Sequence, residues 1–423
     1  MGLSLSRKII ARAAGRRSVE PGEHVLVTPQ KAMTYDPQAG PLQRRLGQRW
    51  GDTMRLWDAD RVILVADHFL AADDPAQRQK QEELAAFARR FGVRHFYPVG
   101  APNHGVCHAL LPEEGQVRPG ELIAGTDSHS STYGGFGAIG LNVGVDAMEG
   151  ILAIGEHWME VPPDLRIVVE GRLPPDVTAK DVILKLCADL CGTRAAFGAA
   201  IELDGDAIQA LHPEEKLTLA NMAQEIGARW LVIPPDRTVC AWVAALTTEP
   251  FEPLQPDRDA TYSQVLTYRG EDFRRMVAPP GGPERAVPVG RAAPTGFNEV
   301  FVGSCTGAKR HDMEVFFGAL LASGGPAPGV AVMLAPATRR TRDWVLADPA
   351  RAALASAPGV RLAEQPGCDA CAGIYGFIAD DRAVRLSTAN RNYAGRMGAP
   401  GAQVFLGSPT TAALVAATGR LSA

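Results

Sequence analysis

The apolar positions along the chain repeat in two ways. Short apolar runs, such as the one from Val62 to Val65, have the length of buried strands. Longer segments with apolar residues on one side, such as the one that ends before Gly92, have the period of amphipathic helices. This run, this helix and the segment VRHFYPVG follow one another, which is a β-α-β order. The pattern therefore predicts an α/β protein.

The alternation of strand-like runs and turns continues to the end of the chain. It recurs in ELIAGTDSHSS, RIVVEG, NEVFVGSCTG, GVAVML and GVRLAEQPGC. Segments rich in proline and glycine at 161–166 and 278–296 interrupt it. A chain of 423 residues is also too long for one ordinary core. We therefore expect two or three domains, with these two segments as the candidate linkers.

The chain begins with a basic segment, MGLSLSRKIIARAAGRR. Gly2 and Ser6 stand as in a myristoylation signal, and basic segments without acids also occur in transit peptides. Short amphipathic helices share this composition. Because Ile9, Ile10 and Ala13 would form one apolar side, we interpret the segment as the first helix of the fold.

Charge and cysteine content narrow the class of partner. The formal net charge of -4 is spread without acidic or basic blocks, so we expect neither a nucleic acid nor a membrane as the main partner. No apolar run approaches the roughly 20 residues of a membrane span. Seven mostly scattered cysteines do not suit a disulfide framework and suggest a reducing, cytoplasmic compartment. A small-molecule ligand is the remaining expectation.

Residues that can act as acids, bases or metal ligands follow directly after four predicted strands. They are Asp67 and His68, Asp127 and His129, Cys305, and the pair Cys368 and Cys371. Ligands of open α/β sheets gather outside the carboxyl ends of the strands. We therefore expect these residues to share one cleft.

The pair Cys368 and Cys371 is compatible with several functions when it is considered alone. A C-x-x-C segment serves as a redox dithiol, as half of a zinc site or as part of an iron–sulfur site. With Cys305 as a third thiol, the set is able to hold three irons of a cubane cluster and leave the fourth iron without a thiolate. A zinc site would need one further ligand.

Four ordered segments carry a resemblance to a known family. They are GTDSHSSTYGGFGAIGLNVG, VFVGSCTGAKRHDM, PGCDACAG and STANRNYAGRMG. They resemble the signature segments of the aconitase superfamily, and within it the large subunits of 3-isopropylmalate dehydratase and homoaconitase. The likeness runs from about Leu5 to the C-terminus, and four motifs in order are a far stronger signal than one.

The resemblance implies a fold, a cofactor and a set of site residues. The fold is the aconitase-type iron–sulfur fold, with three α/β/α subdomains, expected at 1–163, 164–290 and 291–423, around a central cleft. Cys305, Cys368 and Cys371 match the ligands of a [4Fe-4S] cluster. The implied catalytic residues are Asp67, His68, His108, Asp127, His129 and Glu202, with Glu202 as the partner of His108. The implied substrate-binding residues are Tyr35, Ser128, Asn390, Arg391 and Arg396. Because no acidic run lies near the two arginines, we expect them to bind substrate carboxylates.

The sequence departs from the family at three places. Gly307 follows Ser304, Cys305 and Thr306 where the family usually has asparagine, so a side-chain amide is missing beside the expected cluster. Ala308 and Lys309 replace the usual polar pair. Tyr35 stands where a histidine or glutamine usually contacts substrate. The resemblance therefore leaves the identity of the substrate open.

The resemblance also implies an activity and a partner. The activity is that of a hydro-lyase or isomerase of a 2- or 3-hydroxy di- or tricarboxylic acid, as in leucine biosynthesis, with homoaconitase and citramalate or alkylmalate isomerases as alternatives. The family places a catalytic serine and further arginines on a swivelling domain, which this chain is expected to lack and a small subunit to provide. A cluster-free RNA-binding relative and a zinc protein are the other classes that stay open.

Overall fold

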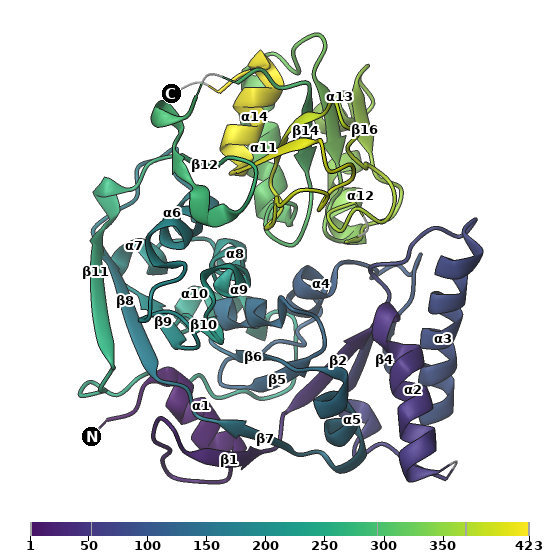
Figure 1. The fold of residues 1–423 in the computed structure, drawn as a ribbon, viewed down its shortest axis with the longest axis vertical. Helices are drawn as coiled ribbons and strands as arrows, with labels where there is room; N and C mark the ends of the chain where they lie inside the picture. Colours follow the sequence, from purple (N-terminus) through teal and green to yellow (C-terminus); the bar gives the residue numbers. More distant parts are fainter. Residues whose placement is uncertain (1, 52, 294, 369, 422–423) are drawn as a thin grey trace.

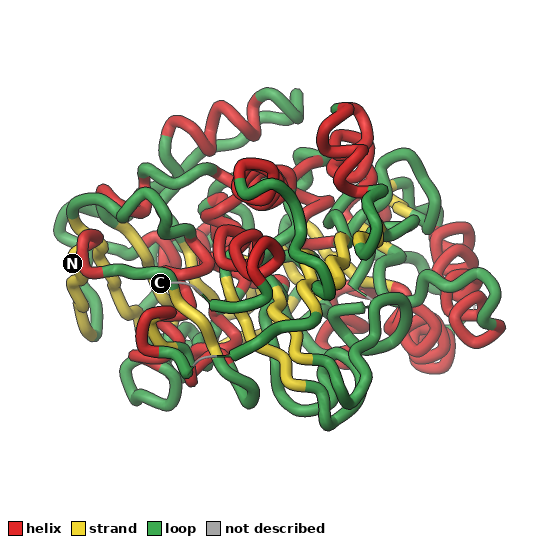
Figure 2. Tube along the Cα trace, turned by 90° about the horizontal axis from the view of Figure 1, so that it is seen from above, coloured by secondary structure: helices red, strands yellow, loops and turns green. Residues whose placement is uncertain are grey.

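The computed structural model describes residues 2–51, 53–293, 295–368 and 370–421. Three sheets, each with helices packed against it, are arranged around the short helix α4 (Cys107–Glu113) (Figure 1). Seen from above, the strands lie mostly in the interior and the helices mostly outside (Figure 2). The prediction of an α/β protein is confirmed.

The first sheet has five strands, which all run parallel. In spatial order they are β4 (His95–Tyr97), β3 (Val62–Val65), β2 (Lys31–Tyr35), β5 (Leu122–Gly125) and β6 (Ile139–Asn142). The same part of the chain holds α2 (Asp36–Trp50), α3 (Pro75–Phe91), α5 (Val145–Ile154) and the 3-10 helices η1 (Ala59–Arg61) and η2 (Ser130–Phe136). The chain order reverses between β2 and β5, so the carboxyl ends of these strands form a natural binding position.

Local sequence explains two of these elements. All four residues of β3 are buried, as in a parallel strand that is covered on both faces. Helix α3 begins after Asp74, whose side chain accepts hydrogen bonds from the N–H groups of Ala76 and Gln77. It ends at Gly92, which adopts the left-handed conformation with φ of 68°. Both predicted elements are confirmed.

The second sheet has four parallel strands. In spatial order they are β10 (Trp230–Val232), β9 (Ala200–Asp204), β8 (Asp164–Glu170) and β11 (Gln264–Arg269). Its helices are α6 (Ala179–Leu190), α7 (Asp206–Gln209), α8 (Pro213–Asn221), α9 (Ala223–Ile226) and α10 (Arg237–Ala244). Helix α8 packs against η2, and Gly134 and Gly135 permit this approach, because a side chain at either would overlap the backbone of β10 or α8.

The third sheet has seven strands, which all run parallel except β12, the antiparallel neighbour of both β13 and β18. In spatial order they are β13 (Val287–Pro288), β12 (Met276–Ala278), β18 (Gln403–Gly407), β17 (Val384–Ser387), β14 (Glu299–Val302), β15 (Ala331–Leu334) and β16 (Val360–Leu362). Its helices are α11 (Arg310–Ala322), α12 (Arg339–Ala347), α13 (Pro349–Ala355) and α14 (Pro409–Thr418), with the 3-10 helices η3 (Gly270–Asp272), η4 (Pro283–Arg285) and η5 (Val289–Arg291) before them. The chain order reverses between β14 and β17, which gives this sheet a binding position of its own.

One strand pairing crosses the expected subdomain limit at residue 290. Strands β12 and β13 lie before residue 290 but join the third sheet through β18. The apolar interiors of the second and third sheets also merge, since Phe301 and Met333 pack in one cluster with Leu165. The subdomain limits themselves stay a prediction.

The N-terminal segment forms the predicted helix, α1 (Leu5–Ala13), with Ile9, Ile10 and Ala13 buried. A small antiparallel sheet of β1 (His24–Val27) and β7 (His157–Glu160) lies beside it. The longest described helix, α3, has 17 residues. Among the described residues, no helix combines the length and apolar character that crossing a membrane requires.

Candidate active site

A cavity of about 250 Å³ lies where the carboxyl ends of strands from the first and third sheets meet. It contains every predicted site residue except Asp67 and Glu202. Its lining consists of Tyr35, His68, His108, Asp127, Ser128, His129, Ser304, Cys305, Cys368, Cys371, Ala372, Asn390, Arg391 and Arg396. Residues far apart in the sequence therefore share one cavity, as the strand-end positions predict.

Three of the seven cysteines line this cavity. Cys305 follows β14, and Cys368 and Cys371 lie in the segment after β16. Burial raises the pKa of the Cys305 thiol to about 12, so the free thiol stays protonated at neutral pH. A metal cation reverses this preference, because thiolates are its ligands.

Two side-chain amides lie beside these thiols. The Nδ2 of Asn221 donates a hydrogen bond to the Sγ of Cys305 at 3.1 Å, and the Nδ2 of Asn390 lies 3.8 Å from the same sulfur. The Oδ1 of Asn390 lies 3.8 Å from the Sγ of Cys371. The family's asparagine is missing at Gly307, but Asn221 and Asn390 bring two other side-chain amides close to the cysteine sulfurs.

The backbone before and after Cys305 is tightly fixed. Ser304 adopts the left-handed conformation with φ of 74°, which is strained for a residue with a side chain and recurs at functional sites. Gly307 packs against Thr388 so closely that a side chain at 307 would overlap it. Lys309 donates to the carbonyl oxygen of Cys305 at 3.0 Å. Two of the three departures from the family, at Gly307 and at Lys309, therefore help to fix the conformation of this loop.

His68 lies between two carboxylates. Its Nδ1 is 2.7 Å from the Oδ1 of Asp67, and its Nε2 is 3.7 Å from the Oδ2 of Asp127. Burial opposes the charge of the imidazole, but Asp67, Asp127 and Asp36 outweigh it and raise the pKa of His68 to about 10. His68 is therefore protonated at neutral pH and can donate a proton.

A second imidazole–carboxylate pair joins α4 to the loop after β5. The Nε2 of His108 lies 2.7 Å from the Oδ1 of Asp127, and both residues are buried. Burial raises the pKa of Asp127, but His108 and His129 outweigh it and hold the pKa well below its ordinary value. Asp127 therefore stays ionised and orients the imidazole.

A third pair holds His129. Its Nε2 lies 3.0 Å from the Oε1 of Glu225 on α9. Burial lowers the pKa of His129, but Glu225 and Asp127 outweigh it and raise the pKa to about 9. The same Glu225 oxygen accepts a hydrogen bond from the Nε of Arg391 at 2.7 Å. No acidic run lies near Arg391 in the sequence, but packing brings Glu225 to its Nε from a distant segment. The binding of a substrate carboxylate by Arg391 stays a prediction.

Glu202 does not partner His108 in this structure. It is the third residue of the five-residue strand β9, so its side chain lies beside the sheet and not beyond its carboxyl end. Its carboxylate accepts hydrogen bonds from the hydroxyl of Tyr262 at 2.6 Å and from the N–H of Leu5 at 2.9 Å. The proposed pair is corrected: Asp127 is the partner of His108, and Glu202 ties α1 to the second sheet.

The remaining predicted residues lie on the cavity wall. The ring of Tyr35 meets the ring of His68 edge to face, with centroids 4.8 Å apart. Ser128 lies beside His129, with its Oγ 3.2 Å from Nδ1. The Nε of Arg396 is buried and has no hydrogen-bond partner among the described residues. A buried donor without a partner suits a site that receives an anionic ligand.

Three site residues were missed by sequence reasoning. They are Asn221, Glu225 and Asp36. Asn221 and Glu225 stand four positions apart in LANMAQEIG, and this pair of polar residues among small apolar ones was the available signal. The carboxylate of Asp36 accepts hydrogen bonds from the N–H groups of Asp67, His68 and Phe69, so it fixes the loop of the first pair.

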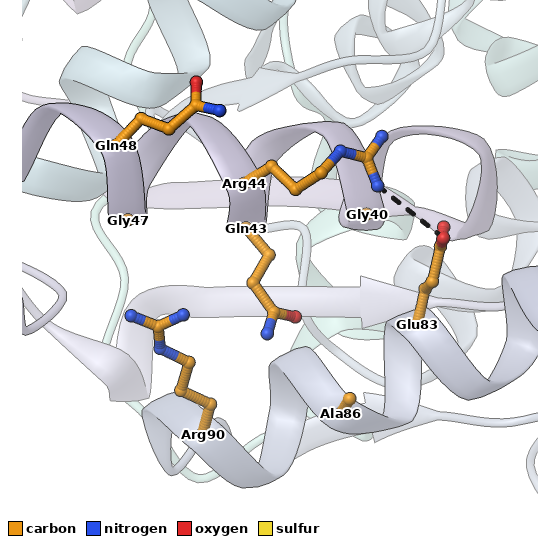
Figure 3. Close-up of a pocket in the computed structure, with 8 residues that line it drawn as sticks. All are labelled: Gly40, Gln43, Arg44, Gly47, Gln48, Glu83, Ala86 and Arg90. Carbon is orange, nitrogen blue, oxygen red and sulfur yellow. Dashed lines mark ion pairs between the residues drawn. The ribbon is translucent and has the colours of Figure 1, made fainter. Parts of the chain in front are cut away.

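Two other cavities have a different lining. One of about 490 Å³ lies between α2 and α3, where Arg44 faces Glu83 with 3.7 Å between their charged groups (Figure 3). The other, of about 830 Å³, runs from Leu70 to Ile378 along the junction of the first and third sheets. Among the described residues, neither lining holds an imidazole or a thiol. The smaller cavity with three thiols and three imidazoles is therefore the candidate active site.

The fold and the site together define a class of protein. It is an α/β enzyme in which three thiols and three imidazole–carboxylate pairs surround one cavity. The family model for the aconitase family (aconitate hydratase) matches residues 51–419. The chain belongs to the aconitase family, and it is a hydro-lyase with the aconitase-type fold.

Curated relatives cover the whole chain. A 3-isopropylmalate dehydratase large subunit 1 of Methanopyrus kandleri is 33% identical over 100% of this chain and 99% of the relative. A 3-isopropylmalate dehydratase large subunit of Sulfurihydrogenibium sp. is 36% identical over 100% of this chain and 96% of the relative. A probable methanogen homoaconitase large subunit of Methanosarcina mazei is 37% identical over 87% and 92%.

One solved structure has a weaker likeness. Aconitase X of Thermococcus kodakaraensis, in its holo-form, aligns with a TM-score of 0.48 and 11% identity, covering 86% of this chain and 84% of the other. A likeness of this size carries no argument about the site.

Proposed function

We propose that the chain is the large catalytic subunit of a [4Fe-4S]-dependent dehydratase that removes water from a hydroxy di- or tricarboxylic acid and adds it back. The observation that carries the proposal is the single cavity in which three thiols and three imidazole–carboxylate pairs meet. Thiols supply cluster ligands, and imidazole–carboxylate pairs move protons.

The residues fit the cluster. Cys305, Cys368 and Cys371 are soft sulfur donors that line the same cavity, which suits iron–sulfur binding better than hard cations. The amides of Asn221 and Asn390 lie where they can stabilise sulfur ligands. When bound, the cluster supplies an iron without a thiolate ligand, which acts as a Lewis acid on the substrate hydroxyl.

The imidazoles supply proton transfer in this proposal. His68 and His129 are protonated at neutral pH, with pKa values of about 10 and about 9 that their carboxylate partners raise against the effect of burial. A protonated imidazole beside a leaving hydroxyl donates the proton with which it departs as water. Asp127 keeps His108 in one orientation for the same purpose.

The arginines supply substrate binding. Arg391 and Arg396 line the same cavity as Asn390, and a guanidinium binds a carboxylate through two parallel hydrogen bonds. Glu225 occupies the Nε of Arg391, so the terminal nitrogens are the ones that face a substrate. The substrate is therefore an anion with at least two carboxylates.

The substrate belongs to the 3-isopropylmalate type, in which case the enzyme serves leucine biosynthesis. Relatives with that name cover the full chain at 33% and 36% identity. Homoaconitase is the second candidate, since a relative with that name is 37% identical over 87% of the chain. Tyr35 is the wall residue that differs from the family pattern and is the proposed place of selection.

A small partner subunit completes the site in this proposal. The relatives that match the full chain are named large subunits, and the family places a catalytic serine and further arginines on a swivelling domain. All seven cysteines are unpaired, which suits a reducing, cytoplasmic location. We propose neither zinc nor RNA binding, because the three thiols fit the cluster and the charge is mildly acidic.

The test is an assay of the reconstituted complex. The chain is loaded with iron and sulfide without oxygen, combined with a small subunit of a 3-isopropylmalate dehydratase, and offered a panel of 2- and 3-hydroxy di- and tricarboxylates. We expect turnover of at least one malate-like member, and none by the large chain alone. A cluster-loaded complex that turns over no member of the panel contradicts the proposed function.

A further inference from the structure

Lys180 is a fully buried cation beside the candidate active site. It is the second residue of α6, and 1% of its surface is exposed. Its Nζ donates hydrogen bonds to the Oγ1 of Thr306 at 3.1 Å, the carbonyl oxygen of Thr388 at 3.1 Å and that of Ala389 at 2.6 Å. Lys180 therefore connects the loop that holds Cys305 to the loop that holds Asn390.

Lys180 has no carboxylate partner among the described residues, unlike the other deeply buried lysines. Lys216 is paired with Asp236 at 2.8 Å, and Lys309 with Asp312 at 2.7 Å. The carboxylate that acts on Lys180 most strongly, after the thiol of Cys305, is that of Glu225, which is already bonded to His129 and Arg391.

A buried charge without a partner is costly, and it normally loses its proton or finds a counter-charge. Burial lowers the pKa of Lys180 to about 8, while Cys305 and Glu225 oppose that effect. Three oxygen acceptors around the Nζ satisfy all three of its N–H donors in the charged form. The site is thus built for an ammonium group whose counter-charge lies elsewhere.

We propose that Lys180 is the counter-charge of the iron–sulfur cluster and sets its reduction potential. The inference rests on the proposed function, since it needs the cluster. Three thiolates outweigh the positive charge of an oxidised cubane core, so the bound group is an anion, and one-electron reduction adds another negative charge. A buried cation nearby stabilises the reduced form more than the oxidised form.

The substitution that isolates the charge is Lys180→Gln. Glutamine keeps an N–H donor toward the carbonyl oxygens of Thr388 and Ala389 and removes the positive charge. We expect a more negative reduction potential in a mediated titration followed by electron paramagnetic resonance. Lys185→Gln is the matched control, because Lys185 lies on the same helix but is partly exposed and paired with Asp189. Its potential should equal that of the wild type.

A merely structural role of Lys180 predicts a different result. If Lys180 only connected the two loops, its replacement would lower the melting temperatures of the cluster-free and cluster-loaded proteins by the same amount. If Lys180 is a counter-charge, Lys180→Met should lower the melting temperature of the loaded protein more than that of the cluster-free protein. In the cluster-free protein the loss is offset, because the variant also removes an unpaired buried charge. The difference in melting temperature between loaded and cluster-free protein should therefore shrink in the variant.

The outcomes separate the two claims. Wild-type protein that takes up no iron and sulfide overturns the proposed function and this inference with it. Wild-type and Lys180→Gln proteins that hold equal iron and have equal potentials overturn the inference alone. Equal losses of melting temperature in the loaded and cluster-free forms of Lys180→Met also overturn it. A negative shift in Lys180→Gln, with none in Lys185→Gln, supports it.

Discussion

The carboxylate of Glu225 lies 3.0 Å from the Nε2 of His129, although 96 positions separate the two residues in the sequence. The same oxygen accepts a hydrogen bond from the Nε of Arg391 at 2.7 Å. One buried carboxylate thus fixes a proposed proton donor and a proposed substrate-binding arginine relative to each other.

Glu225→Gln should lower kcat by roughly two to four orders of magnitude, the usual contribution of a positioned proton-transfer group. The physical reason is that the neutral amide no longer raises the pKa of His129 or orients Arg391. Steady-state kinetics and iron content are measured together, and iron should stay at the wild-type level. Glu252→Gln, at an exposed residue paired with Arg12, is the control. A variant with wild-type kcat would remove Glu225 from the proposed machinery.

Glu202→Gln should reduce stability and leave kcat close to the wild-type value. Glu202 accepts hydrogen bonds from the N–H of Leu5 and the hydroxyl of Tyr262, and both bonds are weakened when one oxygen becomes an amide. We expect the free energy of unfolding to fall by about 1–3 kcal/mol, as for a disturbed buried hydrogen bond. Urea unfolding measures it. A large loss of kcat at unchanged stability would return Glu202 to the catalytic residues.

These two glutamates show what sequence could and could not predict. Asp67 and Asp127 were predictable, because the carboxyl ends of parallel strands in one sheet lie at the same edge, and Tyr35 was predictable from the family resemblance. Glu225 was not, since the four-residue helix α9 has no periodic pattern and reaches the site only through packing. Glu202 was misassigned because a motif match gives a position along the chain and not the direction of a side chain.

In the fold, too, some elements were predictable from the sequence and others were not. Strand β3 and helices α1 and α3 were predictable from local apolar patterns and caps. The pairing of β12 with β18 was not, because two strands far apart in the sequence are joined by a long-range antiparallel contact that leaves no local signal.

Asp67→Asn should move the basic limb of the kcat/KM profile to lower pH. Burial lowers the pKa of His68, but Asp67 and its neighbours raise it to about 10, so the protonated form persists below that pH and is lost as pH rises through it. Without the charge of Asp67 the loss begins roughly one to three pH units earlier. A pH profile of the reconstituted complex measures the shift. A basic limb at the wild-type position would contradict the role of His68 as the proton donor.

Tyr35→His should change the choice of substrate more than the rate. The ring of Tyr35 lies edge to face on His68 and occupies the cavity wall. A smaller ring enlarges the space for the part of the substrate beyond its malate-like core. The measurement is the ratio of kcat/KM for two substrates that differ only in that part, in wild type and variant. If both values fall together and the ratio is unchanged, Tyr35 supports the site without selecting the substrate.

Cluster binding by Cys305, Cys368 and Cys371 is the central claim, and Cys368→Ser tests it most directly. Cys240, a partly exposed residue of α10 outside the cavity, provides the control Cys240→Ser. Both variants and the wild type are reconstituted without oxygen, and iron per chain and visible absorbance are measured. The account predicts that Cys368→Ser loses most of its iron and the brown absorbance while Cys240→Ser keeps both. Equal iron content in the two variants would contradict it.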